Sequence, residues 1–380
     1  MAIKREENKE QYFKGCLIGG AIGDALGYPV EFMSYNEILR VYGKDGITHY
    51  KLASNGKALI SDDTQMTLFT ANGILIGNTR GCMRGVEGLP HGYIHMAYLD
   101  WLTTQGYKKP TDTINISWLL KVPELHNCRA PGNTCISALC SPEERSVEKP
   151  LNKSKGCGGV MRIAPYGLFY GKFENEQPQL FITEAAEIGA ITHGQTMSHL
   201  SCSLMASIIG QIIYGSAPGA GEHWDALEEI VSDALFQVKT WGVASRHKEE
   251  FDALMKRAVE LTKNNSTDEE NIRSLGEGWV AEEALAIAIY CACKYQNESM
   301  KGIIAAVNHS GDSDSTGAIA GNILGAWNGY DAFPKEFIKD LEIADVIEEI
   351  ATDLSTGCPM SEYGSYRDQK WIDKYIEMDV

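Results

Sequence analysis

The chain has 380 residues, of which 44% are hydrophobic and 22% charged, and its formal net charge is −17. This apolar content is that of a chain that buries a core, so intrinsic disorder is not expected. The excess of 51 Asp plus Glu over 34 Lys plus Arg argues against binding to long nucleic acid or to an anionic membrane surface. An anionic ligand would therefore need a local device, such as backbone amides or a bound cation.

Ten cysteines are scattered along the chain without the paired spacing of a zinc site. Several lie in apolar stretches (Cys16, Cys202, Cys291 and Cys293), and the first residues have no apolar signal-peptide segment. We therefore expect reduced, mostly buried thiols in a cytoplasmic protein. We interpret the longest apolar runs as broken by charge well short of the about 20 residues that a bilayer span needs, and expect no membrane partner.

Apolar residues at helical spacing predict helices, in chain order, at residues 11–27, 62–77, 92–104, 179–190, 197–214, 224–240, 248–263, 278–296, 300–308 and 315–328. The best strand candidate is the short segment 46–52. Clusters of Gly, Pro, Asn, Ser and charge predict loops at residues 105–115, 141–158, 215–222 and 264–277. Length alone suggests about two or three domains, but no long linker divides the chain, so we predict one large all-α domain.

Two runs of glycines are spaced by four residues, at positions 15, 19, 23 and 27 and again at 317, 321, 325 and 329. This spacing places the glycines along one slowly drifting face of a helix. Glycine inside a helix costs about 1 kcal/mol relative to alanine, so something must approach these backbones closely. Close helix–helix packing in the core is the simplest cause, and it would also bring together residues at the ends of the two helices.

Two acidic groups stand where predicted helices begin, Ser61-Asp62-Asp63-Thr64 and Asp312-Ser313-Asp314-Ser315. Each group could simply cap its helix, because Ser and Asp are common at N-caps and acids favour the first turn. One cap needs only one acceptor, however, and both groups have two carboxylates with flanking hydroxyls. Such an oxygen-only set suits a hard cation, Mg²⁺, Mn²⁺ or Ca²⁺, and two ions about 4 Å apart could share it.

Glu31 lies in the turn beyond the first glycine-lined helix, where a lone acid is ordinarily solvated. Arg162 is interpreted as one partner of a pair at the edge of the core, with phosphate binding as the alternative. His199 and Trp279 are interpreted as core residues. His309 is either a surface residue or a partner of the second acidic group.

Taken together, these segments resemble the ADP-ribosylglycohydrolase family. The resemblance is carried by an ordered set of motifs: GCLIGGAIGDALGYPVEF (15–32), SDDTQMTL (61–68), RAPGNTC (129–135), GCGGVMRIAPYGL (156–168), ITHGQTMSHLS (191–201), GWVAEEALAIA (278–288) and HSGDSDSTGAIAGNILGAWNG (309–329). Each motif is weak by itself, but the order from residue 15 to residue 329 is specific.

The resemblance implies an orthogonal all-α fold with a binuclear Mg²⁺ or Mn²⁺ centre. By motif position, the metal ligands would be Ser61, Asp62, Asp63, Asp312, Asp314 and Ser315. The ADP-ribose would be held by Gly132, Asn133, Cys157, Gly158, Gly159 and His193. A motif-bearing core would span about residues 11–330, and residues 331–380 would form a C-terminal helical extension packed on it, within a single domain of residues 1–380.

This chain departs from the family pattern in two ways. Serine replaces the usual threonine at positions 61 and 315, which retains the hydroxyl oxygen and should preserve metal binding. Many relatives have Gly-Asn-Gly where this chain has Gly156-Cys157-Gly158, so an asparagine contact with the ligand is not expected here.

The implied activity is hydrolysis of the glycosidic bond between ADP-ribose and an acceptor, with arginine on a protein as the first choice. Candidate catalytic residues are Glu31, Asp62, Asp63 and Asp314, of which Glu31 or Asp63 is expected to transfer the proton. The alternatives are another adduct (O-linked serine, a nucleic-acid base or a free nucleotide derivative) and a non-catalytic ADP-ribose-binding relative. The last is disfavoured because all the named acids are present. A monomer is favoured.

Overall fold

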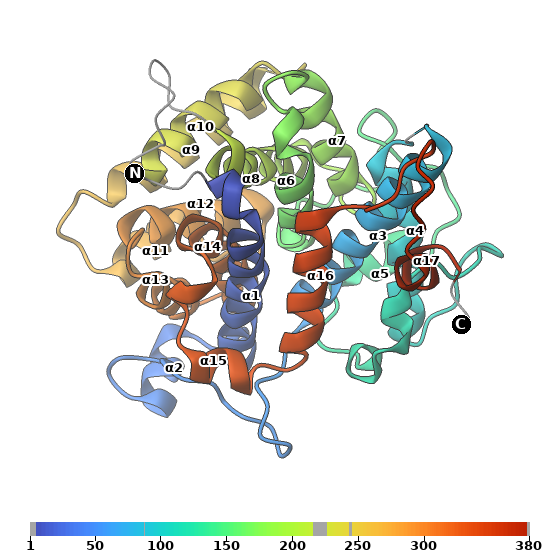
Figure 1. The fold of residues 1–380 in the computed structure, drawn as a ribbon. Helices are drawn as coiled ribbons and strands as arrows, with labels where there is room; N and C mark the ends of the chain where they lie inside the picture. The colour runs from blue at the N-terminus through green and yellow to red at the C-terminus, as the bar shows by residue number, and fades with distance from the viewer. Residues whose placement is uncertain (1–4, 87, 216–225, 243–244, 378–380) are drawn as a thin grey trace.

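The computed structural model describes residues 5–86, 88–215, 226–242 and 245–377 (Figure 1). Within these ranges the secondary structure consists of helices and three isolated β-bridges, without a strand, which confirms the predicted all-α fold class. The α-helices are α1 (Lys9–Gly27), α2 (Tyr35–Tyr42), α3 (Asp62–Arg84), α4 (Pro90–Thr104), α5 (Asn133–Leu139), α6 (Ala164–Tyr170), α7 (Pro178–Ala190), α8 (Thr196–Tyr214), α9 (Leu227–Lys239), α10 (Ser245–Leu261), α11 (Asp268–Leu275), α12 (Ala281–Lys294), α13 (Ser299–Val307), α14 (Ser313–Asn328), α15 (Lys335–Asp340), α16 (Ala344–Thr356) and α17 (Gln369–Tyr375).

All ten predicted helices have counterparts, with ends that differ by several residues at most, except that α3 continues to Arg84. Residues 216–222 of a predicted loop and residues 224–225 of a predicted helix lie outside the described residues. The predicted strand at 46–52 is wrong: this segment is irregular, and only Leu52 forms a single bridge, to Ala58. The short helices α2, α5 and α6 were not predicted, because none is long enough to show a clear helical period.

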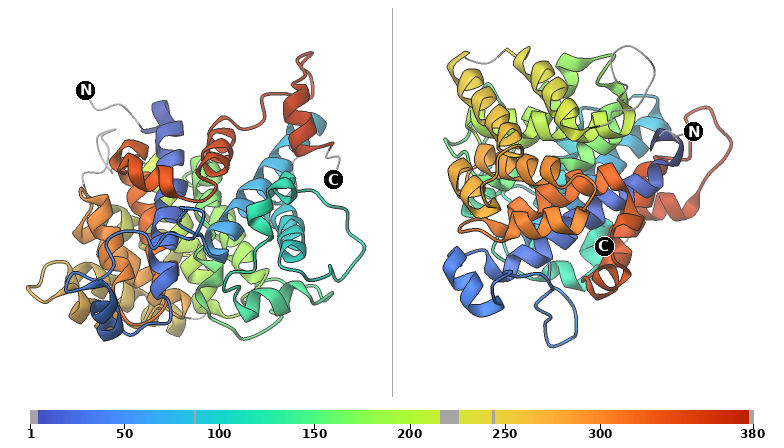
Figure 2. Two further views of the ribbon diagram at one scale, coloured as in Figure 1. Left: turned by 90° about the horizontal axis from the view of Figure 1, so that it is seen from below. Right: turned by 90° about the vertical axis from the view of Figure 1, so that its left-hand side faces the viewer.

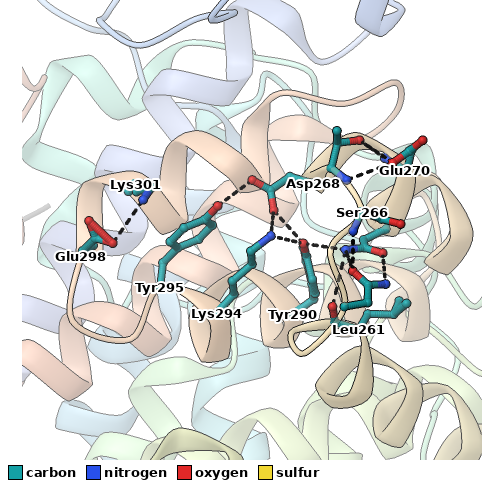
Figure 3. A network of polar contacts seen from close by, with 12 residues as sticks. Leu261, Ser266, Asp268, Glu270, Tyr290, Lys294, Tyr295, Glu298 and Lys301 are labelled. Carbon is teal, nitrogen blue, oxygen red and sulfur yellow. Dashed lines mark hydrogen bonds and ion pairs between the residues drawn. The ribbon is translucent and has the colours of Figure 1, made fainter.

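The predicted loop at 264–277 is also wrong, because it contains α11. Thr267 and Glu270 form a reciprocal capping box at the start of this helix. Asp268 then ties the helix to α12 and the turn that follows it, accepting hydrogen bonds from Tyr290 Oη (2.6 Å), Lys294 Nζ (2.8 Å) and Tyr295 Oη (2.8 Å) (Figure 3). The charge and polarity that suggested a loop are therefore the groups that hold this helix in place.

The centre of the molecule is the antiparallel pair of α1 and α14, which lie side by side in Figures 1 and 2. Their glycines face one another in register: a Cβ on Gly23 would collide with the carbonyl of Gly317, and one on Gly19 with the carbonyl of Gly321. Gly15 meets Gly325 in the same way. The prediction of close packing along the glycine faces is confirmed. Because the pair is antiparallel, the C-terminal end of α1 lies beside the N-terminal end of α14.

The C-terminal helices lie against helices from the first third of the chain, as both views of Figure 2 show. Helix α16 contacts α1 and α3, and α17 contacts α3, where Trp371 Nε1 donates to Thr79 Oγ1 at 2.9 Å. The division into a motif-bearing core and a C-terminal extension packed on it stays a prediction. The assignment of residues 1–380 to one domain stays a prediction.

Helix α8 corrects the expectation about apolar runs. Its 19 residues, Thr196–Tyr214, contain no Asp, Glu, Lys or Arg, and they are long and apolar enough to cross a membrane. However, 94% of its most apolar window is buried inside the protein, as in the core helix of a globular fold.

The cysteines are less uniformly buried than predicted. Cys16, Cys135, Cys202 and Cys291 are buried thiols, whereas Cys128 and Cys140 are exposed. The prediction of mostly buried thiols is therefore right only for part of the set.

Candidate active site

A cavity of about 200 Å³ lies where the C-terminal end of α1 meets the N-terminal ends of α3 and α14. Both acidic groups face it, although about 250 residues separate them in the sequence. The glycine contacts between α1 and α14 explain this meeting, because they fix the end of one helix against the start of the other. Of the predicted site residues, those lining the cavity are Glu31, Asp62, Asp63, Gly132, Asn133, Cys157, Gly158, His193, Asp312, Asp314 and Ser315.

Two predicted residues do not line the cavity. Ser61 is fully buried behind it as the N-cap of α3, where its Oγ accepts a hydrogen bond from the Asp63 N–H at 3.2 Å. Gly159 faces the core instead, since a Cβ there would lie 3.1 Å from both Cys202 Sγ and Ser198 Oγ. The capping interpretation thus holds for Ser61, but it does not account for the two acids that follow.

Asp24, on α1, supplies a second cap for α3 that the sequence analysis missed. Its carboxylate accepts the Ser61 N–H at 3.0 Å, the Thr64 N–H at 3.1 Å and the Thr64 hydroxyl. Because Asp24 and Ser61 accept hydrogen bonds from N–H groups at the start of this helix, the carboxylates of Asp62 and Asp63 are left to line the cavity. The available signal in the sequence was an acid among the glycines of an apolar helix.

The closest acids come from two elements. Glu31, Asp312 and Asp314 are all buried and place one carboxylate oxygen each within 4.8 Å of the others. Glu31 follows the short 3₁₀ turn Tyr28–Val30, which continues α1 past its glycine-lined face. The prediction that a cluster of carboxylates can hold a metal ion is therefore supported by the geometry.

The electrostatics of this cluster are unfavourable as it stands. Burial, and then repulsion from neighbouring carboxylates, raises the pKa of Glu31, Asp63 and Asp314 above their ordinary values. Burial also raises the pKa of Asp62, although a hydrogen bond from the Gly132 N–H opposes this effect. No Lys or Arg is among the described residues that line the cavity.

Two carboxylate oxygens in the cluster have no hydrogen-bond partner among the described residues. These buried atoms are Asp63 Oδ1 and Glu31 Oε2. A divalent cation would supply both the missing contacts and the missing positive charge, and carboxylate oxygens are the ligands that hard cations prefer. The residues present therefore fit a metal centre.

The opposite wall of the cavity is formed by backbone and neutral side chains rather than by charged ones. A Cβ on Gly158 would lie 2.8 Å from Cys135 Sγ and 2.9 Å from His193 Cε1, so only glycine allows this approach. Burial lowers the pKa of His193 to about 3, so the imidazole is neutral, and it pairs with Thr192 Oγ1 at 2.8 Å. Neutral groups and amides suit an anionic ligand beside an acidic cluster better than further acids would.

Cys157 links this wall to the second acidic group. Its thiol donates to Asp312 Oδ2 at 2.8 Å, and the Ser315 hydroxyl lies 3.5 Å from its sulfur. Burial raises the pKa of the thiol, which therefore keeps its proton for this hydrogen bond. The residue in the asparagine position of the family motif thus orients a carboxylate of the cluster.

The remaining side chains divide between core and rim. Trp279 was predicted to be core and is not: it is 39% exposed, lines the cavity and stacks on Phe32 at 5.6 Å between ring centroids. Arg162 is fully buried, donates to Thr192 Oγ1 at 2.7 Å and does not reach the cavity. His199 is a core residue, as predicted, and His309 is buried with its Nε2 2.9 Å from Thr316 Oγ1, in the first turn of α14.

Comparison with known proteins identifies the family. The family model described as ADP-ribosylglycohydrolase matches residues 5–363. The chain belongs to this family. Among solved structures, this chain is similar in fold to an "ADP-ribosylglycohydrolase-related protein complex", with a TM-score of 0.61 and 20% identity, covering 92% of this chain and 99% of the other.

Three relatives give the family context for this chain. The bovine (Bos taurus) ADP-ribosylhydrolase ARH3 is 24% identical, over 90% of this chain and 92% of that protein. The ADP-ribosyl-[dinitrogen reductase] glycohydrolase of Rhodospirillum rubrum is 23% identical, over 87% and 90%. The ADP-ribosylarginine hydrolase Tri1 of Pseudomonas putida is 22% identical, over 91% and 78%. Family membership makes this protein an ADP-ribosyl hydrolase.

Proposed function

We propose that this protein removes ADP-ribose from modified arginine on proteins, using two Mg²⁺ or Mn²⁺ ions. The observation that carries the proposal is the meeting of two distant acidic groups at one cavity in a chain of this family. The choice of arginine is supported by the relative from Pseudomonas putida, which is an ADP-ribosylarginine hydrolase. O-linked serine and nucleotide adducts are the competing acceptors.

The cations would be held by Asp62, Asp63, Asp312, Asp314 and Ser315, with Ser61 behind them. When bound, they would polarise hydroxyl groups of the distal ribose and favour ionisation of a water molecule in the cavity. The oxygen-only donor set favours Mg²⁺ or Mn²⁺ over zinc. A single ion at Glu31, Asp312 and Asp314 is the minimum that the carboxylate spacing supports.

Proton transfer is assigned to Glu31 or Asp63. Glycoside hydrolysis adds water to the anomeric carbon while the leaving group, here the arginine nitrogen, gains a proton. Each of these two acids lines the cavity and has two carboxylate oxygens, so one oxygen could contact a cation while the other accepts a proton from water or delivers one. The two acids come from different elements, the turn after α1 and the start of α3, so they could act on different sides of the sugar.

The ADP part of the substrate would lie against the backbone wall. Gly132 and Gly158 present it with backbone, and His193 presents it with a neutral ring, which permits a close approach of the pyrophosphate. Asn133 stands at the edge of the same wall. This local device is what the net charge of −17 requires for an anionic substrate.

The test is mass spectrometry of product release from matched peptides carrying ADP-ribose on arginine or on serine, and from a nucleotide adduct. Each substrate is incubated with Mg²⁺, Mn²⁺ or EDTA. We expect the fastest release from arginine and none in EDTA. Faster release from serine would refute the acceptor assignment, and release undiminished by EDTA would refute the metal requirement. No release from any substrate would leave only ADP-ribose binding, which titration with ADP-ribose measures separately.

A further inference from the structure

The described residues include only two non-glycine positions with a left-handed backbone, Ala130 (φ 50°) and Ile343 (φ 48°). Each directly follows one partner of the same buried ion pair, between Arg129 and Glu342. Left-handed backbone is unfavourable for residues with a Cβ and persists only where the surroundings impose it. The ion pair is therefore a point at which two strained segments are held against each other.

Arg129 connects this pair to the first acidic group. Its Nη2 donates to Glu342 Oε1 at 2.9 Å, while its Nη1 donates to Glu342 Oε2 and, at 3.0 Å, to the carbonyl of Ile60. The Arg129 carbonyl in turn accepts the Asp62 N–H at 3.3 Å. Arg129 therefore forms hydrogen bonds with the residues on both sides of Ser61, at the point where α3 begins.

The same loop also reaches the side chain of Asp62. Three residues after Arg129, the Gly132 N–H donates to Asp62 Oδ2 at 3.3 Å. Both the main chain and the carboxylate of Asp62 are therefore oriented by residues 129–132. A shift of Arg129 would move this carboxylate relative to Asp312 and Asp314 on the other wall.

Backbone hydrogen bonds to a segment near the start of the sequence fix the position of Glu342. Its N–H donates to the Ala58 carbonyl at 3.0 Å, and the Ala58 N–H donates to the Asp340 carbonyl at 2.8 Å. Lys57 Nζ adds a bond to the Lys339 carbonyl at 2.7 Å. The segment 339–342 therefore runs beside the segment that leads into the first acidic group, and its one inward acid is buried against Arg129, with 5% and 11% of the two side chains exposed.

We propose that Glu342 is a positioning residue for the metal centre: through Arg129 it holds Asp62 in the orientation that cation binding needs. The inference rests on the proposed function in so far as the acidic cluster binds cations. It gives the C-terminal segment, which carries no recognisable motif, a role in the site. Glu342 does not line the cavity, so it acts only through the Arg129 loop.

The test measures Mn²⁺ affinity by the electron paramagnetic resonance signal of free Mn²⁺, alongside the melting temperature, for full-length Glu342→Gln and Glu342→Ala. The matched control is Asp353→Asn in the same C-terminal segment, where Asp353 accepts from Lys374 and Tyr375 and does not line the cavity. We expect the dissociation constant for Mn²⁺ to rise at least 10-fold in both Glu342 variants. In Asp353→Asn it should stay within 2-fold of wild type, even if the melting temperature falls equally.

A dissociation constant within 2-fold of wild type in folded Glu342→Ala would overturn the proposal, as would an equal loss of affinity in Asp353→Asn. Should both Glu342 variants fail to fold, Arg129→Lys, which keeps the charge but loses the two-pronged contact, must show the same 10-fold loss. Failure of the proposed function is separable, because wild-type protein can bind Mn²⁺ without releasing ADP-ribose from arginine. A wild-type protein that binds no Mn²⁺ would refute both the role of Glu342 and the metal requirement of the proposed function.

Discussion

Substituting Gly321 by alanine tests the direct backbone contact between α1 and α14. A Cβ at this position would overlap the carbonyl of Gly19 and come within 3.0 Å of the Gly20 nitrogen. These are main-chain atoms in the middle of a helix, so they cannot turn aside as a side chain would. The variant should therefore push the two helices apart.

Two opposing effects set the size of the stability change in Gly321→Ala. Alanine in place of glycine stabilises a helix by about 1 kcal/mol, whereas overpacking a close contact costs about 1–3 kcal/mol or more. Gly92→Ala, in the first turn of α4, is the control, since a Cβ there would meet nothing within 4 Å. The difference between the two variants isolates the contact, and we expect it to reach about 3 kcal/mol.

Calorimetry of the metal-free protein measures this difference. With an unfolding entropy of about 2.1 cal/mol/K per residue, 380 residues unfolding together give about 0.8 kcal/mol/K, so 3 kcal/mol corresponds to about 4 °C. Mn²⁺ affinity should fall in Gly321→Ala alone, because α14 carries Asp314. A melting temperature for Gly321→Ala equal to or above that of Gly92→Ala would refute the packing argument.

Three further outcomes follow from the site. Asp314→Asn should lower turnover at least about 100-fold. It should leave the metal-free melting temperature unchanged or higher, because it removes one of several buried acids that repel one another. Near-normal turnover would show that Asp314 is not part of the site. Asp24→Asn should lower the melting temperature and weaken Mn²⁺ binding. The amide donor of asparagine would face the Ser61 and Thr64 N–H groups, which should cost about 1–3 kcal/mol of stability. Unchanged stability would contradict the role of Asp24 as a cap. The pKa of Glu31 and of Asp62 is raised to about 8 in the folded protein, from ordinary values of 4.5 and 3.8. As the pH rises, the unfolded chain therefore loses these protons before the folded protein does. The contribution of these two acids makes the free energy of unfolding of the metal-free protein fall as the pH rises from about 4 to about 8. Melting curves across this range, with and without saturating Mn²⁺, check this, and a fall of equal size in both series would count against it.

The sequence predicted the centre of this fold better than its periphery. Glycines spaced by four have one main physical use in a helix, close approach of another backbone, so the pairing of Gly19 with Gly321 could be anticipated. The doubled acids at 62–63 and 312–314 likewise exceeded what capping requires. These patterns are local in sequence and have few alternative explanations.

Features that depend on tertiary contacts could not be predicted in this way. Helix α11 has a polar sequence, and Asp268 holds it through partners more than 20 residues away. Trp279 has the composition of a core residue, and only the path of its loop leaves it on the rim of the cavity. Asp24 looked like one acid in an apolar helix, because its partners lie 37 and 40 residues further along the chain.

The pairing of α1 with α14, and of Arg129 with Glu342, also has a consequence for how the protein is made. A ribosome delivers Asp62 and Asp63 some 250 residues before their counterparts on α14, and Glu342 later still. Throughout that interval the glycine-lined face of α1 lacks α14, and Asp62 and Asp63 lack the acids that share their cavity in the folded protein. The acidic cluster around the cavity is therefore complete only after α14 has been made.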